Sequence, residues 1–244
     1  MSAVRARRTA ASAIVAAAIA GSAIGGAATA QAAAPSPVSS VTAVAAGVGT
    51  APTRTYRADV DGDGRADQVT VASTRNHQLR VTVRTATKRT ASILIDQSDF
   101  GTAVPDTPYY GAADFDGVRG QELFIFYGFG AHTPWFKMLT WRDGRLFATR
   151  DPYSGEPSWA PDAAYGYGTG YTLSGKGANK KLVVTQATHV LNGDGYRGTD
   201  TTYAWSTAKN RWLKKSTRAV RFSDERSMRH FGWHAPGLKA MPWM

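Results

Sequence analysis

The sequence of 244 residues predicts an all-β protein built from antiparallel sheets. Three observations support this fold class. Apolar and polar residues alternate with a period of two in short runs, as in half-buried strands. Gly, Asn, Asp and Pro separate these runs, as turns require. Finally, the chain downstream of its N-terminal segment lacks the amphipathic helices of about 10–15 residues that parallel β-α-β units need.

Each alternating run is assigned to one strand, and the Asp143-Gly144 pair marks a hairpin turn. A short helix is expected at Ser223–Phe231, where Ser223 is the N-cap and Gly232 follows the end. The expected strands are Gln68–Ser73, Gln78–Arg84, Thr90–Ile95, Glu122–Tyr127, Trp135–Arg142, Arg145–Thr149, Lys181–Val190, Thr201–Ser206 and Arg211–Phe222.

Residues 1–32 have the anatomy of a secretory signal peptide. Arginines near the start precede an uncharged apolar stretch at 9–28, and Ala28-Thr29-Ala30 fits the small-residue cleavage pattern. A membrane anchor is the alternative, but Ala and Gly make this stretch weakly hydrophobic, which favours cleavage. We therefore expect a secreted, extracellular protein without a transmembrane segment after cleavage. Residues 33–52 read as a flexible leader, and residues 53–244 as a single domain.

The composition excludes several classes of site and favours others. With no cysteine, the chain has no disulfide, thiol nucleophile or Cys-based metal site. Its 29 Lys and Arg against 18 Asp and Glu give a formal net charge of +11. Because three arginines lie in the predicted signal, 26 basic against 18 acidic residues remain. An exported basic protein suits an anionic cell-envelope polymer, a carbohydrate or a protein ligand better than nucleic acid, although scattered charge often serves solubility alone.

The segment Tyr56–Val71, YRADVDGDGRADQVTV, contains four aspartates at loop positions 1, 3, 5 and 9, with glycines between them. Carboxylates at this spacing repel one another unless a cation lies among them, and calcium prefers six to eight oxygen ligands. Thr70 stands where a helix-loop-helix calcium site needs a glutamate, so the loop is expected to join two strands. A polar turn without metal is the alternative. The predicted calcium ligands are the side chains of Asp59, Asp61, Asp63 and Asp67 and the backbone carbonyl of Arg65.

A weaker copy of this phrase follows at Ala113–Phe124, ADFDGVRGQELF. With an offset of 55 positions, Asp114, Asp116 and Glu122 correspond to Asp59, Asp61 and Asp67. Val118 replaces one ligand, so any calcium site here would be weak, and a structural turn without metal is favoured over such a site. A third copy at 191–198 lacks the outer acids and is not expected to bind metal.

The phrase ADVDGDGRADQVTV resembles the repeats called FG-GAP or VCBS, which occur in integrin α-subunit propellers and in secreted bacterial proteins. Later pieces, including TWRDGRL at 140–146 and GWHAPGL at 232–238, are similar to those of exported actinobacterial proteins. The resemblance covers about Tyr56 to Leu238. It implies blade-like antiparallel sheets with calcium on their loops, arranged as a propeller or as an open β-meander.

Catalytic motifs are missing from the sequence. It contains no H-E-x-x-H, no G-x-S-x-G and no phosphate-binding glycine loop. The favoured function is therefore an exported calcium-binding module with a binding or structural role, and no catalytic residue is assigned. The alternative is a secreted hydrolase acting on polysaccharide or peptidoglycan, whose acid pair lies on the Tyr153–Tyr171 side, where Glu156 and Asp162 are the residues to test. Aromatic residues of Tyr153–Tyr171 would either stack on sugar or peptide, or form a loop core: Trp159, Tyr165, Tyr167 and Tyr171.

Overall fold

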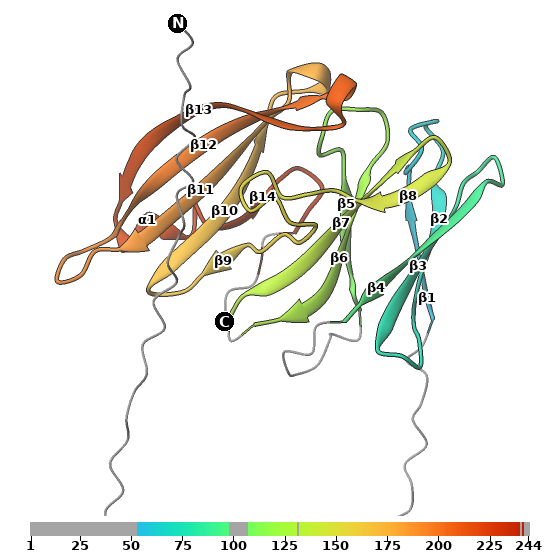
Figure 1. The fold of residues 1–244 in the computed structure, drawn as a ribbon, viewed down its shortest axis with the longest axis horizontal. Coiled ribbons are helices and arrows are strands. Elements are labelled where there is room, and N and C mark those ends of the chain that lie inside the picture. Colours follow the sequence, from blue (N-terminus) through green and yellow to red (C-terminus); the bar gives the residue numbers. More distant parts are fainter. Residues whose placement is uncertain (1–52, 98–106, 131, 240, 242–244) are drawn as a thin grey trace, which may run out of the picture. The chain divides into compact units, whose positions relative to one another are not determined.

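The computed structural model describes residues 53–97, 107–130, 132–239 and 241. The predicted signal peptide at 1–32 and leader at 33–52 lie outside these residues and stay predictions. The described residues form three sheets, antiparallel apart from one short strand, and one short α-helix (Figure 1). The predicted all-β fold class is confirmed.

The first sheet is a four-stranded meander with the strand order β1-β2-β3-β4. Its side chains alternate strictly between two environments, since successive residues of a strand point to opposite faces. Val69, Val71 and Val81 are buried, whereas Gln68, Arg80 and Arg84 are exposed on the outer face. The strands are β1 (Arg54–Ala58), β2 (Asp67–Ser73), β3 (Gln78–Arg84) and β4 (Thr90–Asp96).

The second sheet repeats the meander with the order β5-β6-β7-β8 and is buried on both faces along β6. Leu123 and Ile125 pack in a core with the first sheet, while Phe124 and Phe126 pack in a core with the third. A strand covered on both faces is apolar throughout, as the run LFIF is. The strands are β5 (Tyr109–Ala113), β6 (Glu122–Phe129), β7 (Pro134–Arg142) and β8 (Arg145–Ala148).

The third sheet has the order β13-β12-β11-β10-β14, and β9 pairs with β10. All its pairings are antiparallel except that of β14, which runs parallel to β10. No helix of the described residues is long and apolar enough to cross a membrane. The elements are β9 (Asp162–Ala163), β10 (Tyr167–Ser174), η1 (Gly177–Asn179), β11 (Lys181–His189), β12 (Tyr196–Ser206), η2 (Thr207–Lys209), β13 (Arg211–Phe222), α1 (Asp224–Ser227) and β14 (Gly232–His234).

The sequence analysis missed several strands and overestimated the helix. Strands β5, β9, β10 and β14 were not predicted, and β1 was implied by the loop that joins two strands but was given no bounds. Strand β10 contains glycines that weaken any sequence signal for a strand. Gly168 and Gly170 are nevertheless required there, because the ring of Phe231 and the carbonyl of His230 lie where a β-carbon would stand. The helix ends at Ser227, and Ser223 is its N-cap without a side-chain hydrogen bond.

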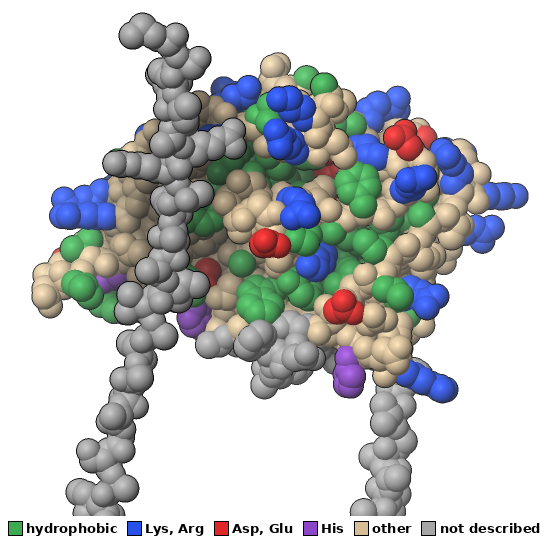
Figure 2. Space-filling view, viewed as in Figure 1, with side chains coloured by type: hydrophobic (Ala, Val, Ile, Leu, Met, Phe, Trp, Pro, Cys, Tyr) green, Lys and Arg blue, Asp and Glu red, His purple; other side chains and the backbone are tan. Residues whose placement is uncertain are grey.

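The surface reflects the basic composition. On the face drawn in Figure 2, Lys and Arg side chains are widely spread and Asp and Glu are few. Several acids are instead buried, including Asp67, Asp116, Glu122 and Asp162. Buried carboxylates require hydrogen bonds or nearby cations, so the segments around these acids must supply them.

We predict that Gly170→Ala destabilises the fold by about 1–3 kcal/mol or more, because the added β-carbon would lie 1.6 Å from the carbonyl oxygen of His230. The measurement is the free energy of unfolding in urea. Gly166→Ala is the control, since nothing lies within 4 Å of its β-carbon position. Equal stabilities of the two variants would contradict the packing of the C-terminal segment against β10.

Candidate metal centre

The first acidic loop connects β1 to β2, and its ends meet because Ala58 pairs with Asp67. Asp67 is 1% exposed, and its carboxylate accepts backbone N–H groups from the start of the loop and from the β3–β4 connection. Oδ2 accepts from Val60 at 2.7 Å and from Asp61 at 3.3 Å, and Oδ1 accepts from Ala86 at 2.8 Å. These bonds hold Asp67 in one orientation at the base of the loop.

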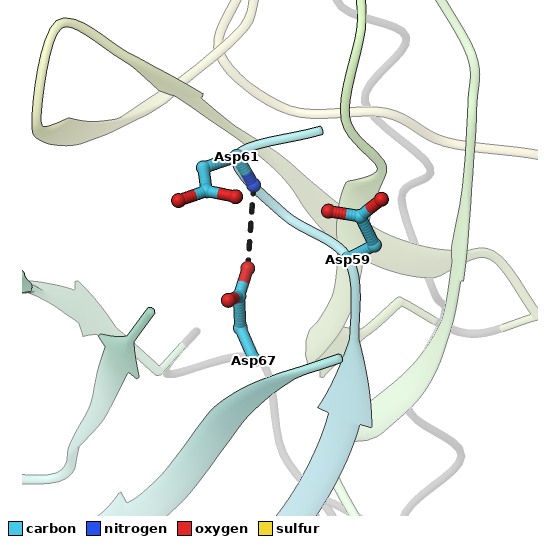
Figure 3. A group of neighbouring side chains, drawn as sticks. All are labelled: Asp59, Asp61 and Asp67. Atoms are coloured by element: carbon cyan, nitrogen blue, oxygen red, sulfur yellow. Dashed lines mark hydrogen bonds between the residues drawn. The ribbon is translucent and has the colours of Figure 1, made fainter. Parts of the chain in front are cut away.

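Three of the four predicted aspartates converge in this loop (Figure 3). Asp59, Asp61 and Asp67 each offer a carboxylate oxygen, and these oxygens lie within 4.8 Å of one another. Oδ2 of Asp59 accepts the N–H of Gly64 at 3.0 Å, but its Oδ1 is buried without a hydrogen-bond partner. A buried carboxylate oxygen without a donor is unfavourable, and a cation would satisfy it.

Asp63 and Arg65 are exposed, and Asp63 lies outside this cluster. The N–H of Asp63 donates to Oδ1 of Asp61 at 3.2 Å, and Oδ1 of Asp63 accepts the N–H of Arg65 at 2.8 Å. The side chain of Asp63 is therefore engaged in its own turn. The structure brings together Asp59, Asp61 and Asp67, and it leaves Asp63 apart from them.

The cluster carries negative charge that nearby basic residues do not neutralise. Within the described ranges, none of Asp59, Asp61, Asp63 and Asp67 forms an ion pair. Burial raises the pKa of Asp61, and the charges of Asp67, Asp63 and Asp59 raise it further, against the N–H of Asp63, which lowers it. A bound cation would remove this repulsion.

The second acidic loop, between β5 and β6, has the same construction. Glu122 takes the place of Asp67: its Oε2 accepts the N–H of Phe115 at 2.7 Å and of Asp116 at 3.3 Å. Its Oε1 accepts the hydroxyl of Thr140 at 2.9 Å. Oxygens of Asp114, Asp116 and Glu122 also lie within 4.8 Å of one another. The 55-residue offset seen in the sequence thus holds for the hydrogen bonds of the two loops.

The two loops differ in how their charge is balanced. Nη2 of Arg142, on β7, lies 2.6 Å from Oδ2 of Asp116 and 3.4 Å from Oε1 of Glu122. Nζ of Lys180 lies 2.6 Å from Oδ1 of Asp114 and donates to its backbone carbonyl. Side-chain cations therefore stand among the acids of the second loop. At the 55-residue offset, the position of Arg142 corresponds to a neutral residue, Thr87, in the turn between β3 and β4.

Burial still dominates the titration of the second loop. The pKa of Glu122 is raised to about 7, mainly by burial and also by the charge of Asp116. The N–H of Phe115 and the charge of Arg142 lower it, but by less. Burial likewise raises the pKa of Asp116 despite the adjacent Arg142. The second loop is consequently sensitive to pH near neutrality.

The two loops pack against each other. The N–H of Gln121 donates to the carbonyl of Asp59 at 2.8 Å, and Oε1 of Gln121 accepts the N–H of Asp59 at 3.0 Å. Gly62 and Gly120 have positive φ angles, and a β-carbon on either would lie within 2.6 Å of the other loop's backbone. A cavity of about 480 Å³ lies between them, lined by Asp59, Gly62, Gly64, Asp114, Arg119, Gly120 and Gln121.

The remaining candidate segments have other roles. The third copy, at 191–198, spans the turn between β11 and β12 and the start of β12. The loop that meets the second acidic loop is instead the β10–β11 connection, where Gly177 and Lys180 contact Gly117 and Asp114. Sequence reasoning missed Arg142 and Lys180, because neither adjoins the acids in the chain. The one sequence feature that could have indicated Arg142 is the 55-residue offset, at which the first repeat has the neutral Thr87.

Of the aromatic residues in Tyr153–Tyr171, some form a core and others are exposed, as stacking on a ligand would require. Trp159 and Tyr171 are buried core residues, whereas Tyr165 and Tyr167 are 78% and 45% exposed. Of the acids named for a hydrolase, Glu156 is exposed and Asp162 is buried. Asp162 accepts hydrogen bonds from Thr133 and from the N–H of Ala164 and contacts Nδ1 of His132 at 3.1 Å. The hydrolase alternative stays a prediction.

We predict that Arg142→Gln destabilises the fold strongly at about pH 8 and much less at about pH 5. Breaking a buried ion pair costs about 3–5 kcal/mol because a charge stays buried without its partner. The carboxyl of Glu122, whose pKa is raised to about 7, is protonated at the lower pH and then needs no cation. Urea unfolding at both pH values measures this. Arg145→Gln, an exposed substitution on β8, is the control, and an equal loss at both pH values would contradict the assignment.

Comparison with known proteins gives no relative on which to rest an assignment. No protein-family model, curated protein or solved structure matches this chain significantly. The conclusions on function therefore depend on the geometry and charge of the site.

Proposed function

We propose that this chain is an exported calcium-binding β-sheet module with a binding or structural role at the cell surface or outside the cell. One observation carries the metal assignment. Two loops of the same construction bury acids, and only the second has a lysine and an arginine among them. The first loop needs an external cation to reach the same charge balance.

Calcium fits the first loop better than other cations do. Every candidate ligand is an oxygen, which suits hard cations, and no cysteine or histidine belongs to the cluster. A loop with several exposed residues adapts to the irregular geometry that calcium accepts and magnesium does not. On metal binding, Asp63 and the carbonyl of Arg65 would complete the ligand set. Extracellular modules bind calcium with dissociation constants of about 10⁻⁴ to 10⁻³ M, which suffices outside the cell.

The metal would bind beside the contact between the first and second sheets. Asp59 offers a carboxylate to the cluster and bonds through its backbone to Gln121 of the second loop. Asp67 begins β2 and fixes the loop base. Calcium would therefore stiffen the contact between the first and second sheets, which favours a structural role for the ion.

The sequence supports the remaining parts of the proposal. The apolar N-terminal stretch with its cleavage pattern supports secretion. The aspartate loop, set between strands of a four-stranded meander, supports membership of the FG-GAP/VCBS repeat proteins. Proposed partners are an anionic envelope polymer, a carbohydrate or a protein.

We predict that calcium raises the melting temperature of the protein by several degrees and that Asp61→Asn abolishes this increase. A ligand that binds only the folded state stabilises it by about 2.7 kcal/mol at a hundredfold excess over its dissociation constant. For a domain of this size that energy corresponds to several degrees. Differential scanning calorimetry with calcium and with chelator measures the effect.

Asp143→Asn is the matched control. Asp143 is exposed in the turn between β7 and β8, and its substitution removes one negative charge, as Asp61→Asn does. Its calcium response should equal that of the unmodified protein. An unmodified protein whose melting ignores both calcium and chelator would contradict the metal site.

A further inference from the structure

The third sheet presents a polar surface that the calcium proposal does not use. One face of β10 to β13 is apolar at one end, where Tyr171, Leu182 and Trp212 join the core shared with the second sheet. Toward the other end of these strands, the same face becomes polar. We call this polar part the platform; it consists of Tyr167, Gln186, Thr188, Arg197, Thr199 and Arg221.

The strand register places these side chains side by side. Tyr167 pairs with Thr188, Thr188 with Arg197, and Arg197 with Arg221, so one row crosses four strands. Directly opposite residues point to the same face of a sheet. At a strand spacing of about 4.8 Å, the row spans about 14 Å. Arg197, Arg221, Thr188 and Tyr167 are all exposed.

The arginine pair is electrostatically unfavourable as it stands. Like charges directly opposite one another on a sheet destabilise it. Neither Arg197 nor Arg221 forms an ion pair with a described residue. Asp200, the one acid in strands β10 to β13, lies on the opposite face and is bound by Arg218 and Thr185. An anion bound between the two arginines would remove the repulsion.

Protection of the sheet edge does not explain this pair. Basic side chains on edge strands prevent edge-to-edge aggregation, which accounts for Arg221 and its neighbours on β13. Arg197 lies on β12, an inner strand, where no edge needs protection. Basic side chains stand beside the end of β13 in Figure 2.

The other end of the row offers an aromatic ring held in place. Tyr167 makes an edge contact with His132 at 5.6 Å between ring centroids, and the buried Asp162 holds His132 through Nδ1. Between ring and arginines lie neutral hydrogen-bonding groups, including Gln186, whose amide donates to Thr169 at 2.9 Å. A preorganised aromatic face with neighbouring hydroxyl and amide groups suits a sugar, and paired guanidinium groups suit a carboxylate or sulfate.

We propose that the platform binds an acidic oligosaccharide, with acidic groups on Arg197 and Arg221 and a sugar ring on Tyr167. The 14 Å row estimated above requires an oligomer rather than a single sugar. Two cations are too few for a nucleic acid, whose binding proteins typically neutralise many phosphates. The inference deepens the proposed binding role and rests on it, but it does not depend on the metal.

The test uses the full chain, with oligogalacturonate and a sulfated heparin oligosaccharide as acidic probes. Fully methyl-esterified oligogalacturonate is the neutral control. We expect titration calorimetry at low salt to show binding of an acidic probe, weakened about tenfold or more by the double variant Arg197→Gln/Arg221→Gln. Tyr167→Ala should weaken it about threefold or more. The matched double variant Arg80→Gln/Arg84→Gln, on the exposed face of β3, should change it less than about twofold.

The melting temperature of the double variant and the choice among probes provide two further checks. Without ligand, the Arg197/Arg221 variant should melt no lower than the unmodified protein, because it loses a repulsion. Equal weakening by both double variants, equal binding of the esterified probe, or binding of neither acidic probe would overturn the proposal. So would binding of DNA or anionic vesicles through these arginines without binding of either acidic probe. Thermal unfolding of the same samples with calcium and with chelator tests the metal site separately, so the oligosaccharide proposal and the calcium proposal can be contradicted independently.

Discussion

The packing of carboxylates into strand connections is the constraint on which the rest of this structure depends. Asp67 and Glu122 begin the second strand of their sheets and close their loops by accepting backbone N–H groups. The same loops carry further acids, so each closure gathers negative charge in a small volume. The loops then meet through Gln121 and Asp59, which joins the first two sheets at the point where charge is concentrated. The first two sheets can therefore pack together only if the negative charge of their loops is neutralised.

The second sheet links the three sheets because both its faces are buried. Residues of β6 alternate between the two large apolar cores, and only the last residue of that strand is partly exposed. Two acids of its loop, Asp116 and Glu122, are buried, whereas only Asp67 is buried in the cluster of the first loop. Deep burial favours a fixed guanidinium, which loses less hydration than an ammonium would. The more open first loop is where an exchangeable ion is physically reasonable.

The sequence predicted the fold class well, since period-two alternation depends only on which side chains face the core. It failed at β10, where the alternation is between aromatic residues and glycines that make room for the C-terminal segment. No local pattern indicates that Phe231 will approach Gly168. For the site, the aspartate spacing correctly grouped Asp59, Asp61 and Asp67. The spacing gave no indication that Asp63 would form its own turn, or that Lys180 would reach Asp114 from another sheet.

The origin of Lys180 bears on the order in which the chain acquires its structure. The first loop is closed by residues within one hairpin and by Ala86, 19 positions from Asp67. The second needs Lys180, which is 66 positions from Asp114 and follows β10. Contacts between residues far apart in sequence form late, because the chain must first close a long loop. A chain emerging N-terminus first can complete its first hairpin with an ion from its surroundings, whereas the second hairpin stays electrostatically incomplete until the third sheet has begun to form.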